Sequence, residues 1–265
     1  HKALAVNLSD LAACGARPLA FTLALALPAA DPAWLEPFSR GLLALADAHG
    51  CELIGGDTTQ GPLNICITVL GEVPSGAARR AGQPATKALL RSGAAPGDDV
   101  YVSGTLGDAR LALEALQGRI QLPGAVLHAA RQRLEQPTPR VALGLALRGV
   151  ASAAADISDG LLGDLGHILE RSAAGATLDT AIAINLLAAQ SYSTRANGLF
   201  GNMLSAQMAL QCVLAGGDDY ELVFTAPPAR RAMVQAASWA SNTPVTRIGQ
   251  IDAAPGLRLL DGHGN

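Results

Sequence analysis

Six aspartates at the ends of expected strands are the residues of this chain whose type and setting could do chemistry. Each lies close to a glycine or a small hydroxyl residue. They are Asp57 in GGDTT, Asp108 in SGTLGD, Asp156 and Asp159 in DISDG, and Asp218 and Asp219 in GGDDYEL. One such aspartate alone is more often a turn or cap residue, because its side chain bonds to nearby backbone and glycine supplies positive φ. The whole set is what indicates a site.

Carboxylates that converge on one place repel one another, and they stay ionised together only if cations lie between them. Oxygen ligands without support from histidine or cysteine favour magnesium, manganese or calcium over zinc. Magnesium is usually held by a few carboxylates together with the phosphate oxygens of a substrate. The aspartates therefore predict a metal-assisted phosphate site.

The SGTLGD segment predicts the other half of such a site: a strand, a glycine turn, and a helix start whose free N–H groups favour an anion. Asp108 lies at this turn, and a bare carboxylate there would repel phosphate, so we expect a metal ion between the two. The sequence has no GxxxxGK[ST] loop, no protein-kinase HRD and DFG set, no GxSxG and no HExxH. His167, on an expected amphipathic helix, is interpreted as a structural residue and not as a base.

The elements that must position these residues follow from periodicity and from cap residues. Apolar spacing predicts a helix from Lys2 to Gly15, which carries Asp10, and a second helix from the N-cap Asp31 to His49. GGDTT is expected to be a turn between short strands at 51–54 and 63–70, which puts Asp57 at a strand end. Further strands are expected at 99–103, 153–157, 220–225 and 245–251, and further helices at 107–116, 126–134, 141–148, 161–171 and 227–239.

The stretch from Pro74 to Pro96 is rich in Gly, Pro, Ala and Arg and is the expected domain junction. With the boundary near Ala95, the N-terminal domain covers residues 1–95 and the C-terminal domain covers 96–265. Helices and strands alternate irregularly, and several strand pairs have short connections. This pattern favours an α+β layer architecture over a doubly wound parallel sheet. Residues 181–205 follow no period and receive no assignment.

Composition excludes several classes of function. The 265 residues are 49% apolar with a net charge of −3, and the basic residues are dispersed, which argues against a nucleic-acid partner. The longest apolar stretch, from Pro18 to Ala30, is too short to span a bilayer. Four isolated cysteines in apolar surroundings and the lack of a visible export signal favour a reduced, cytoplasmic protein. Small molecules are the expected partners, with no nucleic acid and no membrane.

Five long strings, in order across nearly the whole chain, carry a resemblance to a known family. They are KALAVNLSDLAACGA, LIGGDTTQGPL, RSGAAPGDDVYVSGTLGDA, DISDGLLGDLGHILE and GGDDYELVFT. They resemble thiamine-monophosphate kinase, whose fold is the two-domain fold of aminoimidazole-ribonucleotide synthetase. The resemblance implies ATP-dependent phosphorylation of thiamine monophosphate to thiamine diphosphate by direct in-line transfer with magnesium. It also implies a homodimer in which the N-terminal sheets pair.

By position, the resemblance implies a role for eight residues. Asp10, Asp108, Asp156 and Asp159 correspond to magnesium ligands, Gly107, Asp108, Arg133 and Ser158 to ATP contacts, and Asp218 to a substrate contact. No separate catalytic residue is expected, because the transfer is metal-assisted. Asp57 lies in a family motif without an assigned role. The family carries further metal-binding aspartates ahead of the part that matches at Lys2, so the N-terminal domain is expected to be incomplete at its start. Residues 77–90 and 184–207 match the family less well than the rest.

Two other hypotheses remain at this point. The chain could be a related ATP-dependent synthetase of the same fold with a different acceptor, although GGDDYELVFT argues against it. It could also be a nucleotide-binding module without turnover. Product formation separates the kinase from the synthetase, and ATP binding without product would identify the module.

Overall fold

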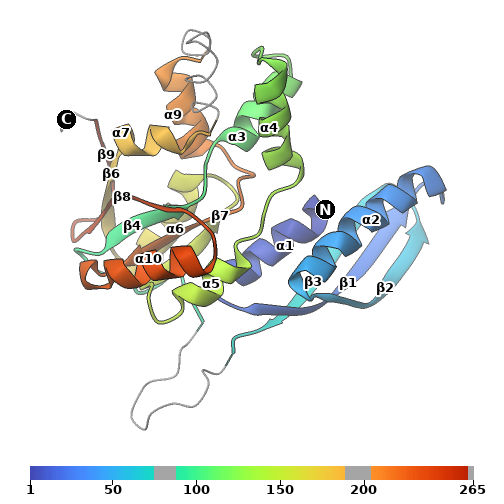
Figure 1. The fold of residues 1–265 in the computed structure, drawn as a ribbon, viewed down its shortest axis with the longest axis horizontal. Coiled ribbons are helices and arrows are strands. Elements are labelled where there is room, and N and C mark those ends of the chain that lie inside the picture. The colour runs from blue at the N-terminus through green and yellow to red at the C-terminus, as the bar shows by residue number, and fades with distance from the viewer. Residues whose placement is uncertain (75–87, 189–203, 262–265) are drawn as a thin grey trace.

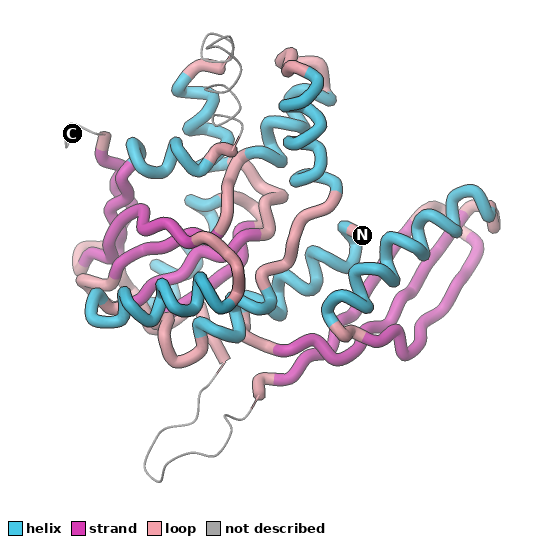
Figure 2. Tube along the Cα trace, in the orientation of Figure 1, coloured by secondary structure: helices cyan, strands magenta, loops and turns pink. Residues whose placement is uncertain are grey.

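The computed structural model describes residues 1–74, 88–188 and 204–261, which form two β-sheets with helices packed against them (Figures 1 and 2). The α-helices are α1 (Lys2–Ala13), α2 (Pro32–His49), α3 (Asp108–Leu116), α4 (Gly124–Glu135), α5 (Val141–Leu147), α6 (Leu161–Ser172), α7 (Thr180–Ala183), α9 (Ala206–Ala215) and α10 (Arg231–Ala240). Short 3-10 helices are η1 (Ile184–Leu186) and η2 (Pro228–Arg230). The strands are β1 (Arg17–Leu27), β2 (Glu52–Gln60), β3 (Asn64–Glu72), β4 (Asp99–Ser103), β5 (Ala153–Ile157), β6 (Gly175–Asp179), β7 (Glu221–Ala226), β8 (Val245–Asp252) and β9 (Gly256–Leu260).

The N-terminal sheet has the order β2-β1-β3, in which β1 runs parallel to β2 and antiparallel to β3. Helices α1 and α2 lie along this sheet (Figure 1). The expected bounds of α2 are confirmed, because Asp31 Oδ1 accepts the N–H of Ala33 at 3.0 Å and Gly50 ends the helix with a φ of 58°. The helix expected from Lys2 is also confirmed, and it carries Asp10 in its second half.

The expected turn at GGDTT is wrong, because β2 continues through it without interruption. Asp57 pairs with Ala24 of β1 and lies within the strand, not at its end. The glycines serve a close approach between strands: a Cβ on Gly56 would lie 1.9 Å from the carbonyl oxygen of Leu23. Pairing with β1, a strand that local patterning did not predict, overrides the turn preference of Gly-Gly-Asp.

The second sheet has six strands in the order β5-β7-β4-β8-β6-β9, antiparallel except for the parallel pair β6–β9. Its strands β4, β5 and β7 are buried on both faces. In β4, Val100 and Val102 belong to one apolar cluster and Tyr101 to the other, as expected from the alternation of side chains along a strand. Helices α6 and α9 contribute to the first cluster, and α1, α5 and α10 to the second. The predicted α+β architecture is confirmed.

Helix α1 joins the two sheets. Its residues Leu4 and Leu8 are fully buried in the cluster that also contains Leu143 of α5 and Phe224 of β7. The first helix of the chain therefore packs against a face of the second sheet, and this packing places Asp10 over the strand that carries Asp156.

Strands β6 and β9 and helix α9 were not predicted, whereas each strand and helix expected between residues 99 and 171 and between 220 and 251 is confirmed to within a few residues. Residues 75–87 of the expected junction, and most of the unassigned 181–205 stretch, lie outside the described residues. The domain boundary near Ala95 stays a prediction. No helix in the described part of the chain is long and apolar enough to cross a membrane.

Candidate functional site

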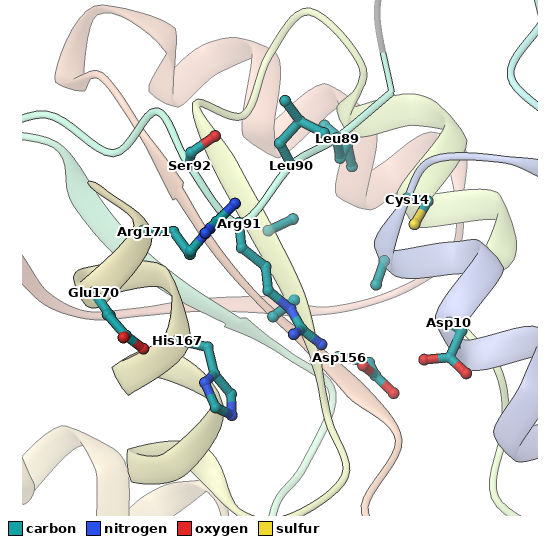
Figure 3. Close-up of a pocket in the computed structure, with 13 residues that line it drawn as sticks. Asp10, Cys14, Leu89, Leu90, Arg91, Ser92, Asp156, His167, Glu170 and Arg171 are labelled. Carbon is teal, nitrogen blue, oxygen red and sulfur yellow. The ribbon is translucent and has the colours of Figure 1, made fainter. Parts of the chain in front are cut away.

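Asp10 of α1 and Asp156 of β5 line one cavity of about 610 Å³. Figure 3 shows the two carboxylates turned toward one another, with the guanidinium of Arg91 beside Asp156. Strand alternation explains the direction of Asp156, because it shares the face of its neighbour Ala154, which packs in the cluster that contains α1. His167 and Arg171 of α6 line the far side of the cavity.

The Asp10–Asp156 pair is a place of unfavourable negative charge. Burial, and then the nearby charge of Asp10, raise the pKa of Asp156 to about 6. Burial also raises the pKa of Asp10, against the attraction of Arg91, which lowers it. The Oγ of Ser9 donates to Asp156 Oδ2 at 3.0 Å and holds that carboxylate in place. Two oxygen-donor side chains that line one cavity, both with a raised pKa, are suited to a hard divalent cation.

The DISDG loop after β5 is held by a residue that the sequence reasoning missed. Asp164 Oδ2 accepts the backbone N–H groups of Ser158, Asp159 and Gly160 at 2.9, 3.0 and 3.2 Å. Asp164 is buried in the first turn of α6, where a carboxylate also suits the helix dipole. Asp164 is the fourth residue of α6, one position beyond the N3 place of a capping box, and an acidic residue in the first turn of the helix is the local signal that could have indicated it.

Asp159 and Ser158 line a second cavity, of about 350 Å³, together with Asp218. Arg110 of α3 and Tyr220 complete the polar part of its wall. The backbone N–H of Asp218 donates to the carbonyl of Ser158 at 2.9 Å, which ties the GGDDYEL loop to the DISDG loop. The structure thus brings the expected substrate contact beside two of the expected ATP and metal contacts.

Gly107 and Asp108 begin α3 beside this second cavity. Gly107 has a φ of 85°, and a Cβ there would lie 2.8 Å from the backbone of Cys212, so only glycine fits. Its N–H donates to both oxygens of Asp219 at 3.0 Å. Asp219 is fully buried, and burial raises its pKa well above the ordinary value. Asp108 is buried, and its Oδ2 accepts the N–H of Ala188 at 3.2 Å.

Arg133 of α4 is engaged with buried acceptors. Its Nη2 donates to Glu221 Oε1 at 2.6 Å and to the carbonyl of Asp219 at 3.2 Å. Glu221 has no exposed side-chain surface, and it also accepts from Arg140 and from Ser103 Oγ. Sequence reasoning missed Glu221, although it lies in the GGDDYEL motif, because nothing local indicates that two arginines converge on it.

The predicted site residues therefore fall into two neighbouring groups on either side of the DISDG loop. Asp10 and Asp156 form the first, and Ser158, Asp159 and Asp218 share the cavity of the second. Within the described residues, no three or more His, Cys, Asp and Glu side chains are placed to hold one metal ion. That the acidic side chains gather around one bound cation stays a prediction. Asp57 lies apart, exposed in β2.

The chain matches two family descriptions that together cover most of its length. Residues 1–73 match AIR synthase related protein, N-terminal domain, and residues 95–262 match AIR synthase related protein, C-terminal domain. The fold and the aspartate-lined cavities thus define the class: this is an AIR synthase related protein.

Relatives within this class are more specific. Thiamine-monophosphate kinase of Salmonella typhimurium is 45% identical over 254 residues, which are 96% of this chain and 72% of that protein. The crystal structure of thiamine-monophosphate kinase from Stenotrophomonas maltophilia K279a is 46% identical with a TM-score of 0.82, covering 97% of this chain and 76% of that one. AaThiL complexed with AMPPCP and TMP is 28% identical with a TM-score of 0.76, covering 97% and 75%. The chain belongs to the thiamine-monophosphate kinase family, which confirms the resemblance of its five strings.

Proposed function

We propose that this protein transfers the γ-phosphoryl group of ATP to thiamine monophosphate, forming thiamine diphosphate and ADP. A phosphate oxygen of thiamine monophosphate attacks the γ-phosphorus directly and in line, and the bond from that phosphorus to the bridging oxygen of ADP breaks. The phosphate acceptor is already anionic, so it needs no general base. The main obstacle is repulsion between two anions, and the chain must overcome it by placing charges and ligands.

The observation that carries the proposal is the position of the DISDG loop between the two cavities. Asp156, on one side of the loop, faces Asp10, and Asp159, on the other, lies beside Asp218. The two cavities are then separated by loop backbone whose N–H groups at Ser158, Asp159 and Gly160 donate to Asp164. Because the N–H groups of this loop are already bonded to Asp164, the expected contact of Ser158 with ATP must come from its hydroxyl group.

Magnesium fits the residues present. Magnesium is usually held by one or two carboxylates together with substrate phosphates, which matches the Asp10–Asp156 pair. Bound magnesium would neutralise phosphate charge and orient the phosphates. Asp10 and Asp156 would hold one ion, and Asp159 and Asp108, which lie by the second cavity and at the start of α3, would serve as ligands nearer the transferred phosphate.

The N-terminal sheet supports the proposed homodimer. Its strand β3 alternates between side chains that pack toward the helices, such as Ile67 and Val69, and exposed ones, such as Thr68 and Leu70. Leu70 is 48% exposed, and Leu19 of β1 is 43% exposed. A sheet face with exposed leucines, over which the described residues place no helix, is the kind of surface that pairs with a second copy.

The direct test is to incubate the protein with ATP, magnesium and thiamine monophosphate and to measure thiamine diphosphate. We expect product in proportion to enzyme, and none when magnesium is chelated. Asp159→Asn should lower kcat/KM by about a hundredfold or more while Tm changes little, because an exposed loop carboxylate contributes more to binding a cation than to packing. Asp47→Asn, on the exposed face of α2, is the matched control and should behave like wild type.

Two results would reject this assignment. Calorimetric ATP binding without any thiamine diphosphate over hours would identify a nucleotide-binding module without turnover. Normal turnover of Asp159→Asn together with a large loss of Tm would reject its role as a metal ligand and make it a structural residue.

A further inference from the structure

Lys2 makes a contact with the substrate side of the site that the roles assigned above do not use. The Nζ of Lys2, in the first turn of α1, lies 2.8 Å from Oδ1 of Asp218. The hydroxyl group of Tyr220 donates to the same oxygen at 3.1 Å. The ammonium group of Lys2 also lies 5.8 Å from the centre of the Tyr220 ring, within cation–π distance. The side chains of Lys2, Asp218 and Tyr220 therefore contact one another beside the second cavity.

The backbone of this loop is held in an uncommon conformation. Asp218 has a φ of 68° and Tyr220 has a φ of 52°. Aspartate tolerates the left-handed region, but a tyrosine there is an outlier that the surroundings must stabilise. The N–H of Tyr220 donates to the carbonyl of Ile157 at 2.9 Å, and its hydroxyl group and ring are held by Asp218 and Lys2. Such strain is typical of a segment whose side chains must point in one direction.

Both bonds to Asp218 fall on one of its two carboxylate oxygens. With Oδ1 held by Lys2 and Tyr220, the rotation of the carboxylate about its side-chain bond is restricted. The other oxygen is then presented in a fixed direction within the cavity that Asp218 shares with Ser158 and Asp159. The restraint comes from α1, so it couples the first helix of the chain to the loop that precedes β7.

We propose that Lys2 is a positioning residue for the acceptor substrate: with Tyr220 it orients Asp218, whose second oxygen then accepts a hydrogen bond from, or pairs with a positive group of, thiamine monophosphate. This inference rests on the proposed function, because it takes Asp218 as the substrate contact. It concerns binding and not the chemical step. The ion pair is partly exposed, with 32% and 39% of the two side chains accessible, so its effect on stability is small.

Lysine is the suitable residue here because its compact ammonium group can contact a carboxylate and a ring face at the same time. Arginine keeps the charge but has a planar, longer head group. Because arginine retains the positive charge that pairs with Asp218, we expect Lys2→Arg to keep most of the thiamine monophosphate affinity of the wild type. Lys2→Gln, which has no charge, should lose it.

The experiment measures the Kd of thiamine monophosphate by calorimetry, and KM for both substrates with kcat by steady-state assay, for wild type, Lys2→Gln, Lys2→Arg and Tyr220→Phe. We expect Lys2→Gln to weaken thiamine monophosphate binding about tenfold, as is typical for loss of a charged hydrogen bond. KM for ATP and kcat should stay within about threefold of wild type. Tyr220→Phe should also weaken thiamine monophosphate binding, but by less than Lys2→Gln does. Arg258→Gln removes an exposed ion pair on β9 and is the matched control.

Unchanged thiamine monophosphate binding in Lys2→Gln, with active wild type, would overturn the inference and leave the proposed function in place. Equal losses for both substrates, with a lower Tm and no recovery in Lys2→Arg, would make Lys2 a structural residue and also overturn it. Wild type that neither binds nor phosphorylates thiamine monophosphate would reject the proposed function and this inference with it.

Discussion

The charged form of the Asp156 side chain is costly in the folded protein unless a cation binds beside it. It is buried, it faces Asp10, and its one described hydrogen-bond donor from a side chain is Ser9. Its pKa of about 6 lies above the ordinary value of 3.8, so the folded protein binds more protons than the unfolded chain between about pH 4 and pH 6. The free energy of unfolding therefore decreases as pH rises through this range, and the full penalty of the charged form is present above pH 6.

In the absence of magnesium, we expect Tm to be higher at pH 5.5 than at pH 7.5, with a contribution from Asp156 of about 1 kcal/mol between these two pH values. Asp156→Asn should remove most of this dependence, because an amide does not titrate. Magnesium should raise Tm of the wild type at pH 7.5 more than at pH 5.5, since it competes with the proton. Differential scanning calorimetry at both pH values measures this. Equal pH dependence in wild type and Asp156→Asn would contradict the assignment.

At the scale of elements, the buried carboxylate of Glu221 connects segments that are far apart in the sequence. It lies at the start of β7 and accepts from Arg133 of α4, from Arg140 before α5, and from Ser103 of β4. The two arginines have less than a fifth of their side chains exposed. This network fixes α4 and the connection to α5 against the six-stranded sheet. It lies next to the loop that carries Asp218 and Asp219.

We expect Glu221→Gln to lower the free energy of unfolding by roughly 3 kcal/mol, because it leaves two largely buried guanidinium groups without a countercharge. Glu135→Gln, on the helix that carries Arg133, is the control, since it breaks the exposed Arg131–Glu135 pair and should cost no more than about 0.5 kcal/mol. Urea denaturation measures the free energy of unfolding of wild type and of both variants. Similar losses would mean that the network does not stabilise the fold more than a surface pair.

At the scale of the whole molecule, the two sheets differ in how far helices cover their faces and edges. The six-stranded sheet is covered by helices on both faces, whereas the N-terminal sheet has helices α1 and α2 along it and an edge strand, β2, that is exposed at every position. Exposed edges and apolar faces of this kind are usually covered by a partner. The proposed homodimer would cover them.

We expect Leu70→Lys to shift the protein from dimer to monomer, because a charged group would have to be buried in the paired sheets. Leu259→Lys changes an equally exposed leucine on β9 of the other sheet and should leave the dimer intact. Light scattering at matched concentrations gives the mass of each. A monomeric wild type, or a dimer that both variants retain, would contradict this interface.

Local patterns in the sequence determined much of this protein. Helix caps such as Asp31 and Gly50, several helices, and the strands β4, β5, β7 and β8 of the second sheet were predicted from neighbours within a few residues, because capping and apolar patterning act locally. The motifs also identified the family. The roles of Asp10, Asp108, Asp156, Asp159 and the other predicted site residues stay predictions until the variants are measured.

The tertiary structure decided what depends on partners far away in the chain. GGDTT became a strand because β1 pairs along it, and the aspartates divided into two groups because α1 packs over β5 while the GGDDYEL loop bonds to the DISDG loop. Glu221 and Lys2 gained importance through partners far along the chain, 216 residues away in the case of Lys2 and Asp218. Charge and hydrogen-bond geometry at such separations are set by packing, so no local pattern can specify them.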